Sequence, residues 1–321
     1  MEPLVTIAIP TFRRLHYLRE SVGSALAQSY RNIEILISHD PGSDREDAIR
    51  QWASRQSLEH SRLRYHVNAA RLGLAGNWNA CADAAKGDLI VIIGDDDRLM
   101  PSFVETLVRA WSPDVSVVFS NHYVITETGE VSPVLTEQFD RLYSRRDMPA
   151  GSLVSPDVWV WRQAVPILSC LIRTADVRKL RFREDLNTPE VELFARLASD
   201  GAKFVYVPEY LAEYRVHMTS ETSRGLKIER LINYLRPLTV SAEARPFKTR
   251  LMSRLVFGSI GRALRAGDPA AARTLLKDEF CPSLAECCKE QGFASAARLL
   301  AYATCARLPR PVLQGLAKAI P

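Results

Sequence analysis

The sequence predicts an α/β protein with a mostly parallel sheet flanked by helices, followed by an all-helical extension. Over the first 120 residues, short β-branched runs alternate with amphipathic segments, which is typical of strands joined by covering helices. One run, Leu89-Ile-Val-Ile-Ile, is apolar throughout and is expected to be a central strand buried on both faces. Beyond about residue 226 only helical periodicity remains. We therefore expect a first domain at 1–225, with halves of about 1–120 and 121–225, and a second at 226–321.

The predicted elements follow in chain order. Strands are expected at residues 4–9, 33–38, 63–67, 89–93 and 115–119, and helices at 14–28, about 45–55, about 74–85 and from Pro101 onward. Residues 121–161 mix Gly, Pro, Ser and charged residues with little period, so hairpins and a long loop are expected there. A strand at 169–173, a helix at 190–200 and a strand at 203–207 complete the first domain. Helices are expected in the second at 226–235, 247–265, 269–279, 282–291 and 295–307.

The composition is that of an ordinary globular protein. Among the 321 residues, 47% are hydrophobic and 25% are charged, which excludes collagen-like, low-complexity and wholly disordered classes. No apolar run reaches the roughly 18 residues that a membrane-spanning helix needs, and the start lacks the pattern of a secretory signal. The six cysteines form no C-x-x-C pair. Reduced thiols in a cytoplasmic protein are therefore expected rather than zinc or disulfides.

The net charge of +5 is unevenly distributed. From residue 245 to the end there are 13 Lys and Arg against 5 Asp and Glu, which leaves the preceding part slightly acidic. The basic helical tail has two interpretations. Its charged residues can form a solvated face over an intramolecular packing stripe, or they can make a peripheral contact with anionic lipid at the inner face of the membrane. A homodimer surface is a further option.

The strongest chemical signal is Gly94-Asp95-Asp96-Asp97, directly after the buried strand. Ligands of open α/β sheets bind at the carboxyl ends of the strands, and adjacent carboxylates need a neutralising partner. Because side chains alternate along an extended segment, Asp95 and Asp97 are expected to point the same way and Asp96 elsewhere. Two carboxylates on one side suit Mg²⁺ or Mn²⁺ that completes its shell with substrate phosphates. A turn or helix cap before Pro101 is the structural alternative.

Polar residues also follow the other predicted strands. Asp40 can accept a hydrogen bond from a nucleotide base or form an Asx turn. The segment Pro10-Thr-Phe-Arg-Arg ends the first strand, where Thr11 can meet a nucleoside or cap a helix. Arg71, at a strand-to-helix turn, can bind a phosphate or base edge or form a surface salt bridge. The asparagines of the next helix, Asn77 and Asn79, are interpreted as helix-surface residues.

Together these motifs resemble family 2 glycosyltransferases of the GT-A fold. The resemblance rests on the order and spacing of Pro10-Thr-Phe-Arg-Arg, Asp40-Pro-Gly-Ser, Arg71-x-Gly, the acid cluster and Tyr206-x-Pro-Glu, over roughly residues 4–217. It implies an inverting, metal-dependent enzyme of polysaccharide or glycoconjugate biosynthesis. The donor would be a nucleotide diphosphate sugar, with a UDP- or dTDP-sugar preferred. The acceptor would be a saccharide, a lipid-linked sugar or a small molecule, and no nucleic acid is expected.

The resemblance also assigns roles to individual residues. Glu190, in Pro189-Glu-Val-Glu-Leu-Phe-Ala-Arg, falls on the catalytic carboxylate, and Glu192 is its nearest competitor. Mn²⁺ or Mg²⁺ would be held by Asp97 as the more direct ligand, with Asp95 and His217. The residues implied in nucleotide binding are Pro10, Thr11, Arg13, Asp40, Arg71, Asp95 and Asp96. The residues implied at the diphosphate or acceptor are Arg215, which would neutralise phosphate charge, and Trp159 and Trp161, which would stack on a sugar or pack in the core.

Two other functions remain open at the level of sequence. A nucleotidyltransferase acting on sugar phosphates can also use a metal-binding Asp pair, but it usually has a glycine-rich triphosphate loop that this chain lacks. A non-catalytic nucleotide-sugar-binding protein of the same fold is the second alternative. Pyrophosphate release would indicate the first, and tight nucleotide binding without transfer would indicate the second.

Overall fold

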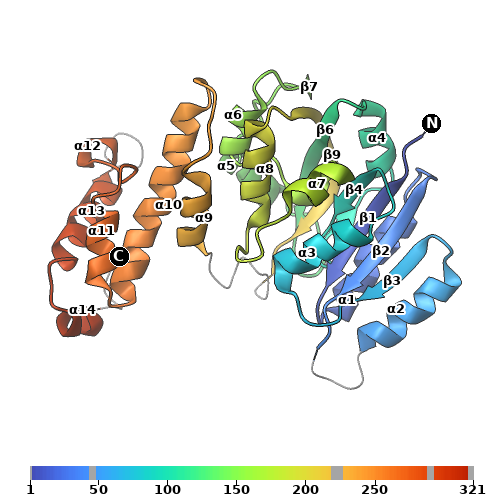
Figure 1. Cartoon of the computed structure of the whole chain (residues 1–321), viewed down its shortest axis with the longest axis horizontal. Coiled ribbons are helices and arrows are strands. Elements are labelled where there is room, and N and C mark those ends of the chain that lie inside the picture. The colour runs from blue at the N-terminus through green and yellow to red at the C-terminus, as the bar shows by residue number, and fades with distance from the viewer. Residues whose placement is uncertain (1, 43–47, 218–226, 288–292, 317–321) are drawn as a thin grey trace. The chain divides into compact units, whose positions relative to one another are not determined.

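The computed structural model describes residues 2–42, 48–217, 227–287 and 293–316. The chain divides into two compact units, residues 1–226 and 227–321, which are coloured from blue to red along the sequence in Figure 1. The predicted division between residues 225 and 226 falls at the end of a segment outside the described residues.

The first unit is built on one mixed sheet, which has nine strands over the described residues. Its parallel part runs in the order β3 (Leu63–Val67), β2 (Ile33–His39), β1 (Val5–Thr11) and β4 (Leu89–Ile92). Next to β4 lies the antiparallel β8 (Cys170–Arg173), followed by β6 (Val115–Ile125), which is parallel to β9 (Lys203–Arg215). The short β5 (Arg98–Leu99) and β7 (Gly151–Ser152) pair antiparallel with β9. All the long ladders are parallel, so the predicted α/β class with a mostly parallel sheet is confirmed.

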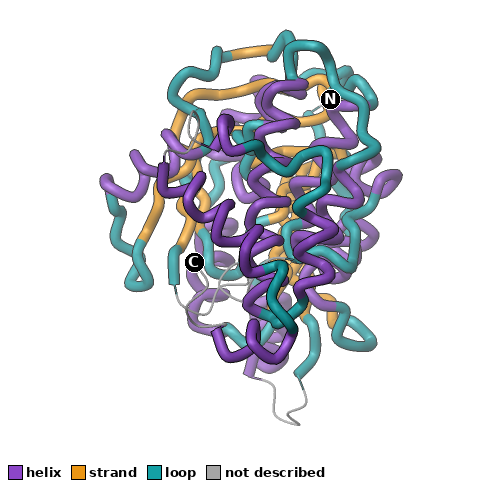
Figure 2. Tube along the Cα trace, turned by 90° about the vertical axis from the view of Figure 1, so that its left-hand side faces the viewer, coloured by secondary structure: helices purple, strands orange, loops and turns teal. Residues whose placement is uncertain are grey.

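Helices connect these strands, and Figure 2 distinguishes the two by colour. They are α1 (Leu15–Leu26), α2 (Ala48–Glu59), α3 (Gly73–Ala84), α4 (Phe103–Ala110), α5 (Pro133–Leu142), α6 (Pro156–Trp161), α7 (Thr174–Leu180) and α8 (Pro189–Ser199), with a 3₁₀ turn at Ile167–Ser169.

The expectation of hairpins and a long loop at 121–161 is wrong for much of that segment. There β6 continues to Ile125, and α5 and α6 follow it. Local chemistry explains the start of α5: the Ser132 side chain accepts a hydrogen bond from the Leu135 N–H, and Pro133 occupies the first turn. The residues that α5 buries, Thr136 and Asp140, are both polar.

The central strands carry the core. Every residue of β1, β2 and β4 is buried, and residues 89–93 are at most 1% exposed, which confirms the predicted two-sided burial. Because these strands are covered on both faces, they can offer polar groups to a ligand only at their ends. The parallel register aligns the ends of β1 and β2, where Thr11 lies opposite His39. The loop after β4 opens at the same edge.

The second unit contains helices and no strand within its described residues. They are α9 (Ile228–Leu235), α10 (Arg245–Arg265), α11 (Pro269–Leu275), α12 (Leu284–Glu286), α13 (Phe293–Cys305) and α14 (Arg310–Leu316). The long α10 packs against α9, α11, α13 and α14. Its Leu251, Leu255 and Val256 are buried, which favours the packing-stripe interpretation of its apolar residues. Of the helix predicted at 282–291, residues 288–291 lie outside the described residues. None of the described helices is sufficiently long and apolar to span a bilayer.

Candidate active site

A pocket of about 380 Å³ opens at the carboxyl ends of β1, β2 and β4. It gathers residues that lie far apart in the sequence, from the ends of strands, from the start of α3 and from the start of α8. The predicted site residues that line it are Pro10, Thr11, Arg13, Asp40, Arg71, Asp95, Asp96, Asp97, Glu190 and Arg215. The tertiary structure therefore brings most of the sequence-predicted site to one cavity.

The acid loop, residues 94–97, folds tightly over its own glycine. The Asp97 N–H donates to the Gly94 carbonyl at 3.2 Å. A Cβ added at Gly94 would lie 2.5 Å from Asp96 Oδ1 and 2.9 Å from Asp97 Oδ2. Only glycine leaves room for these carboxylates, because real Cβ atoms do not approach other atoms so closely.

Asp95 is fully buried and held by the end of β1. Its Oδ2 accepts hydrogen bonds from Thr11 Oγ1 at 2.7 Å and from the Phe12 N–H at 3.4 Å. Its Oδ1 forms an ion pair with Arg14 Nη2 at 2.5 Å. Burial raises the pKa of Asp95 to about 6 against the lowering effect of Arg14. Asp95 therefore joins the acid loop to β1 and α1.

Asp97 is also buried, and it lines the pocket. Its Oδ1 accepts a hydrogen bond from the backbone N–H of Arg215 at 2.9 Å. Burial and the neighbouring charge of Asp96 raise the pKa of Asp97 well above its ordinary value.

Asp96 is the carboxylate of the cluster that stays ionised. Burial works to raise its pKa, but a hydrogen bond from His217 and the charge of Arg14 bring the pKa below its ordinary value. Asp96 Oδ2 lies 2.8 Å from His217 Nε2 and 2.6 Å from Arg14 Nη1. The loop turns rather than extending, so Asp96 faces His217, and the assignment of Asp97 as the more direct metal ligand, with Asp95, stays a prediction.

Arg14 is the site residue that sequence reasoning missed. Its guanidinium pairs with both Asp95 and Asp96 and lies 3.4 Å from His217 Nε2. The adjacent charges of the three aspartates are thus partly offset by a cation of the protein itself. The sequence did contain a signal for Arg14, because it is the second of two adjacent arginines after the first strand. The direction of the Arg14 side chain, however, depends on the backbone of Arg13, whose φ is +64°.

Asp40 lies at the start of α3 and binds its backbone. The buried carboxylate accepts hydrogen bonds from the N–H groups of Leu72 at 3.1 Å and Gly73 at 2.8 Å, and from Asn68 Nδ2 at 2.8 Å. The Asx-turn alternative is therefore wrong, because the partners come from another segment. Arg71, just before this turn, lies 4.3 Å from the centroid of the Phe12 ring instead of forming a surface salt bridge.

Replacing Asp40 by alanine is expected to affect both stability and nucleotide binding. Losing the acceptor at the start of α3 should lower the stability by about 1 kcal/mol. We also expect the affinity for UMP to fall about tenfold or more, because a charged acceptor is removed from the pocket wall. Calorimetry and thermal unfolding would measure both effects, with Asp83→Ala, an exposed aspartate of the same helix, as control. Unchanged UMP affinity would leave Asp40 with the structural role alone.

Glu190 projects from the start of α8 into the pocket. It is the second residue of the helix, after Pro189, and its carboxylate accepts only from its own backbone N–H among the described residues. Burial raises the pKa of Glu190 to about 7. Its competitor Glu192 is 1% exposed and pairs with Arg196 at 2.7 Å and Arg183 at 3.3 Å. These ion pairs give Glu192 a structural role, and they leave Glu190 as the carboxylate available to a substrate.

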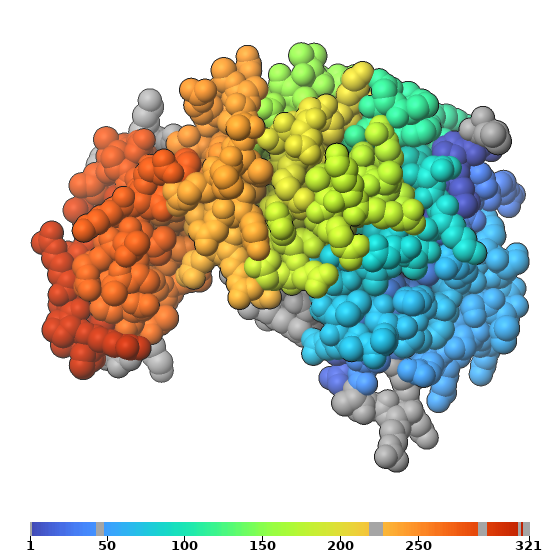
Figure 3. All heavy atoms as spheres, viewed as in Figure 1, coloured from blue at the N-terminus to red at the C-terminus, as the bar shows by residue number. Residues whose placement is uncertain are grey.

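Asn79 anchors the segment that leads to Glu190. Its amide makes two reciprocal hydrogen bonds with the Phe182 backbone, at 3.0 and 2.9 Å. Figure 3 shows the two segments side by side, α3 in cyan and residues around 180 in yellow-green. Asn77 is likewise buried, with Ser38 and Asn68 as partners. The interpretation of Asn77 and Asn79 as helix-surface residues is therefore wrong.

The remaining predicted site residues are Trp159, Trp161 and His217, which do not line the pocket, and Arg215, which does. Trp161 is 3% exposed, and Trp159 lies against the Arg162 guanidinium at 4.8 Å; neither lines the pocket. Only the core alternative is therefore supported for Trp161. The Arg215 side chain is fully buried and donates to protein acceptors, and its role in neutralising phosphate charge stays a prediction. His217 is not a lining residue, yet it adjoins Asp96 from behind.

The fold and this pocket define a glycosyltransferase of the GT-A type. The chain belongs to glycosyltransferase family 2: residues 6–164 match the family model described as Glycosyl transferase family 2. The GalNAc(5)-diNAcBac-PP-undecaprenol beta-1,3-glucosyltransferase of Campylobacter jejuni is 23% identical over 224 residues, which cover 70% of this chain and 68% of that protein.

Two solved structures share the fold at low sequence identity. Mannosyltransferase PcManGT from Pyrobaculum calidifontis, in complex with GDP-Man and Mn²⁺, aligns with 100% of this chain and 85% of its own, with a TM-score of 0.58 and 16% identity. S. aureus TarS 1-349 in complex with UDP-GlcNAc aligns with 98% of this chain and 91% of its own, with a TM-score of 0.66 and 11% identity. The GT-A fold expected from the sequence motifs is thereby confirmed.

Proposed function

We propose that this protein transfers a sugar, with inversion, from a nucleotide diphosphate sugar to an acceptor hydroxyl, assisted by a divalent cation. The observation that carries the proposal is that Glu190, at the start of α8, and the acid loop, which follows β4, line the same pocket. A base and a diphosphate site on one cavity are the two groups that a single displacement needs. No second carboxylate is required to form a covalent intermediate.

The nucleoside end of the donor is assigned to the edge formed by β1, β2 and the start of α3. Asp40, Thr11 and Arg71 are in the pocket wall there, beside Pro10 and Arg13. The aromatic ring of Phe12 lies between the guanidinium groups of Arg71, at 4.3 Å, and Arg13, at 4.9 Å. A UDP- or dTDP-sugar remains the expected donor, and the neighbours solved with GDP-Man and UDP-GlcNAc support a nucleotide sugar in general.

Glu190 is proposed as the general base. When ionised, it would take the proton from the acceptor hydroxyl as that oxygen attacks the anomeric carbon. A carboxylate with a pKa of about 7 is a stronger base than an exposed glutamate and is still substantially ionised near neutral pH. Arg196 of α8 donates to the carbonyls of Leu180 and Arg181 at 2.6 Å each, and these contacts hold the helix that carries Glu190 at the pocket wall.

The donor set at the acid loop fits Mn²⁺ or Mg²⁺. No three His, Cys, Asp or Glu side chains converge on a cation among the residues that the structure describes. The neighbouring Asp96 carboxylate and His217 imidazole instead suit an ion that takes its remaining ligands from phosphates and water. A cation held there would neutralise charge on the leaving diphosphate. Arg14 already contacts Asp95 and Asp96 and can turn to the phosphates when a cation replaces it.

For the acceptor and the biosynthetic pathway we propose only a general class. A saccharide or lipid-linked acceptor is consistent with the undecaprenol-linked substrate in the name of the Campylobacter jejuni relative. A lipid-linked acceptor would agree with the hypothesis that the basic second unit makes a peripheral contact with the membrane. Sedimentation with anionic liposomes, using chains with and without residues 226–321, would test it.

A thermal-shift panel tests the proposed function. We expect a nucleotide diphosphate with Mn²⁺, at about 100 times its dissociation constant, to raise Tm by about 5 °C or more. The nucleotide diphosphate alone should raise Tm less. NMR of the product should show inverted anomeric configuration. Pyrophosphate release from a sugar phosphate and a nucleoside triphosphate would instead indicate a nucleotidyltransferase. Tight nucleotide binding without transfer to any acceptor would indicate a non-catalytic protein.

A further inference from the structure

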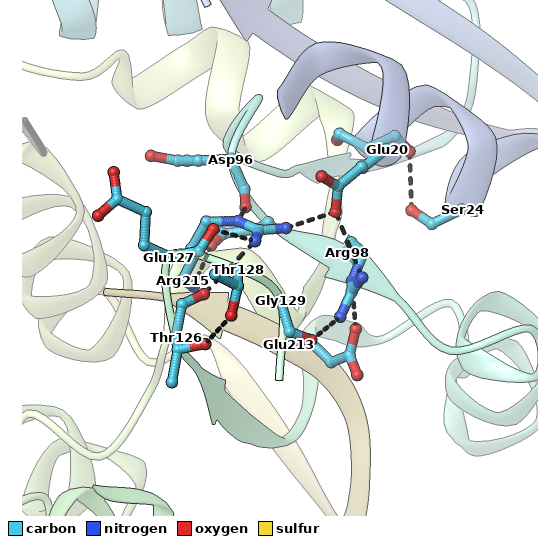
Figure 4. Close-up of polar contacts among 12 residues, drawn as sticks. Glu20, Ser24, Asp96, Arg98, Thr126, Glu127, Thr128, Gly129, Glu213 and Arg215 are labelled. Carbon is cyan, nitrogen blue, oxygen red and sulfur yellow. Dashed lines mark hydrogen bonds and ion pairs between the residues drawn. The ribbon is translucent and has the colours of Figure 1, made fainter. Parts of the chain in front are cut away.

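Two arginines from different strands meet behind the acid loop and share one glutamate (Figure 4). Glu20 Oε2, on α1, lies 2.7 Å from Arg215 Nη2 and 3.3 Å from Arg98 Nη1. Arg98 Nε also pairs with Glu213 Oε2 at 2.6 Å. The Arg215 side chain has no exposed surface, whereas 40% of the Glu20 side chain is exposed. We name Glu20, Arg98 and Arg215 the arginine clamp.

The clamp holds the turn that follows β6. Arg215 Nη1 donates to the carbonyls of Thr126 at 3.4 Å and Glu127 at 3.0 Å. Arg98 Nη2 donates to the carbonyl of Gly129 at 2.7 Å. These contacts draw residues 126–129 against the two guanidinium groups, as Figure 4 shows.

Gly129 is required by this close approach. Its φ is +90°, and a Cβ placed on it would lie 3.1 Å from Arg98 Nη1 and 3.2 Å from Arg215 Nη1. Any side chain at this position would both strain the backbone and press on the guanidinium groups.

The clamp also reaches the acid loop directly. Arg215 Nε donates to the backbone carbonyl of Asp96 at 2.7 Å, and the Arg215 backbone N–H donates to Asp97 Oδ1. Arg215 is two residues before His217, whose ring lies against Tyr17 at a centroid distance of 5.2 Å. The Arg215 guanidinium lies 4.8 Å from the same Tyr17 ring. Arg215 therefore contacts the backbone of Asp96 directly and packs on the same Tyr17 ring as His217.

We propose that the arginine clamp is a positioning device for the diphosphate end of the donor. The inference rests on the proposed function and deepens it, because it assigns Glu20 and Arg98, which do not line the pocket, to the geometry of the site through the lining residue Arg215. Arg98 and Glu20 are remote from the pocket lining and partly exposed. Their replacement should loosen Arg215 and the 126–129 turn, and through them the spacing between Asp96 and His217.

The test compares binding of UDP and UMP, each with Mn²⁺, by calorimetry. Arg98→Met and Glu20→Ala should weaken UDP binding about fivefold or more and leave UMP binding within about twofold. Glu20→Gln, which keeps an acceptor for the guanidinium groups, should restore most of the UDP affinity. The donor KM should rise more than kcat falls. Because Arg215 is buried with its partners, Arg215→Met can fail to fold and is not needed for the test.

The matched control is Arg64→Met. Arg64 also pairs with a glutamate, Glu34 at 2.7 Å, and donates to a carbonyl, that of Ala84 at 3.1 Å, but it does not line the pocket. The Arg64→Met variant should have a lower Tm, and any change in its affinity should be the same for UDP and for UMP. If Arg98→Met and Arg64→Met changed the affinities for UDP and UMP equally, the positioning role of the clamp would be overturned and the proposed function would stand. Failure of the unchanged protein to bind UDP, or any nucleoside diphosphate, with Mn²⁺ would overturn the proposed function and the clamp with it.

Discussion

Glu190→Gln is expected to reduce kcat by about three orders of magnitude while leaving donor affinity nearly unchanged. The amide keeps the size and position of the side chain at the start of α8, but it cannot accept the proton of an acceptor hydroxyl. Among the described residues, Glu192 is not a ready substitute, because its carboxylate is held by Arg183 and Arg196. Single-turnover transfer of labelled sugar and calorimetry with the nucleotide diphosphate would measure the two effects separately.

Glu192→Gln is the matched control for this experiment. It removes a buried charge that pairs with Arg196, so we expect it to lower Tm. Turnover by the remaining folded protein should persist. If Glu190→Gln retained turnover while Glu192→Gln lost it, the base would be reassigned to Glu192.

The activity should also depend on pH through Glu190. The pKa of about 7 predicts that kcat/KM rises about tenfold between pH 6 and pH 8 and is level above that range, because only the ionised carboxylate acts as a base. The Glu190→Gln protein should lack this rise in its residual rate. A profile without a transition near pH 7 would argue against Glu190.

The stability should change in the opposite direction. The folded pKa of Glu190 lies above its ordinary value of 4.5, so the folded protein holds an additional proton between pH 4.5 and about 7. Its contribution to the free energy of unfolding is therefore lost as the pH rises through that window. Urea denaturation at pH 5 and pH 8 should show this loss in the unchanged protein and a smaller one in Glu190→Gln.

Asp96→Asn is expected to lower the metal-dependent affinity for the nucleotide diphosphate about 100-fold. Asp96 is the carboxylate beside His217, and its lowered pKa keeps it ionised and able to bind a cation. An asparagine has the same shape but no charge. Calorimetry with the diphosphate, with and without Mn²⁺, would separate this loss from general damage to the pocket, because UMP affinity should change little.

Asp97→Asn separates the structural assignment from the assignment by resemblance. The asparagine oxygen can still accept the hydrogen bond from the Arg215 backbone N–H, so we expect a loss of diphosphate affinity at least tenfold smaller than for Asp96→Asn. The reverse ranking would restore Asp97 as the more direct ligand and remove Asp96 from that role.

Much of the fold could be predicted because its signal is local. The continuous apolar run at 89–93 and the alternation around it follow from burial of a parallel sheet on both faces. The helices α5, α6 and α7 were not predicted because they are short. Tertiary packing stabilises them more than the hydrophobic periodicity of their own residues does. Ser132 and Pro133 were a readable signal for α5, since both belong to the start of a helix.

The candidate site was predictable in its members and less so in its geometry. Strand ends meet at one edge of a parallel sheet, so Thr11, Asp40 and the acid loop could be expected together. The direction of each carboxylate could not, because alternation holds for an extended strand and the acid loop is a tight turn over Gly94. The partners of the Arg215 guanidinium could not be predicted for a similar reason, because a guanidinium can donate equally well to a phosphate or to backbone carbonyls.

The sequence by itself determined the α/β class, the family, the cluster of aspartates and the candidate base, because these depend on residue type and on order along the chain. Only the tertiary structure decided which aspartate faces His217 and that Glu192 is held in ion pairs. It also decided which groups the guanidinium groups of Arg14 and Arg215 contact. Those choices arise from contacts between segments up to two hundred residues apart, as between Arg215 and Glu20. Burial and hydrogen bonding at such contacts set the pKa and the partner of each group, and neither can be read from neighbouring residues.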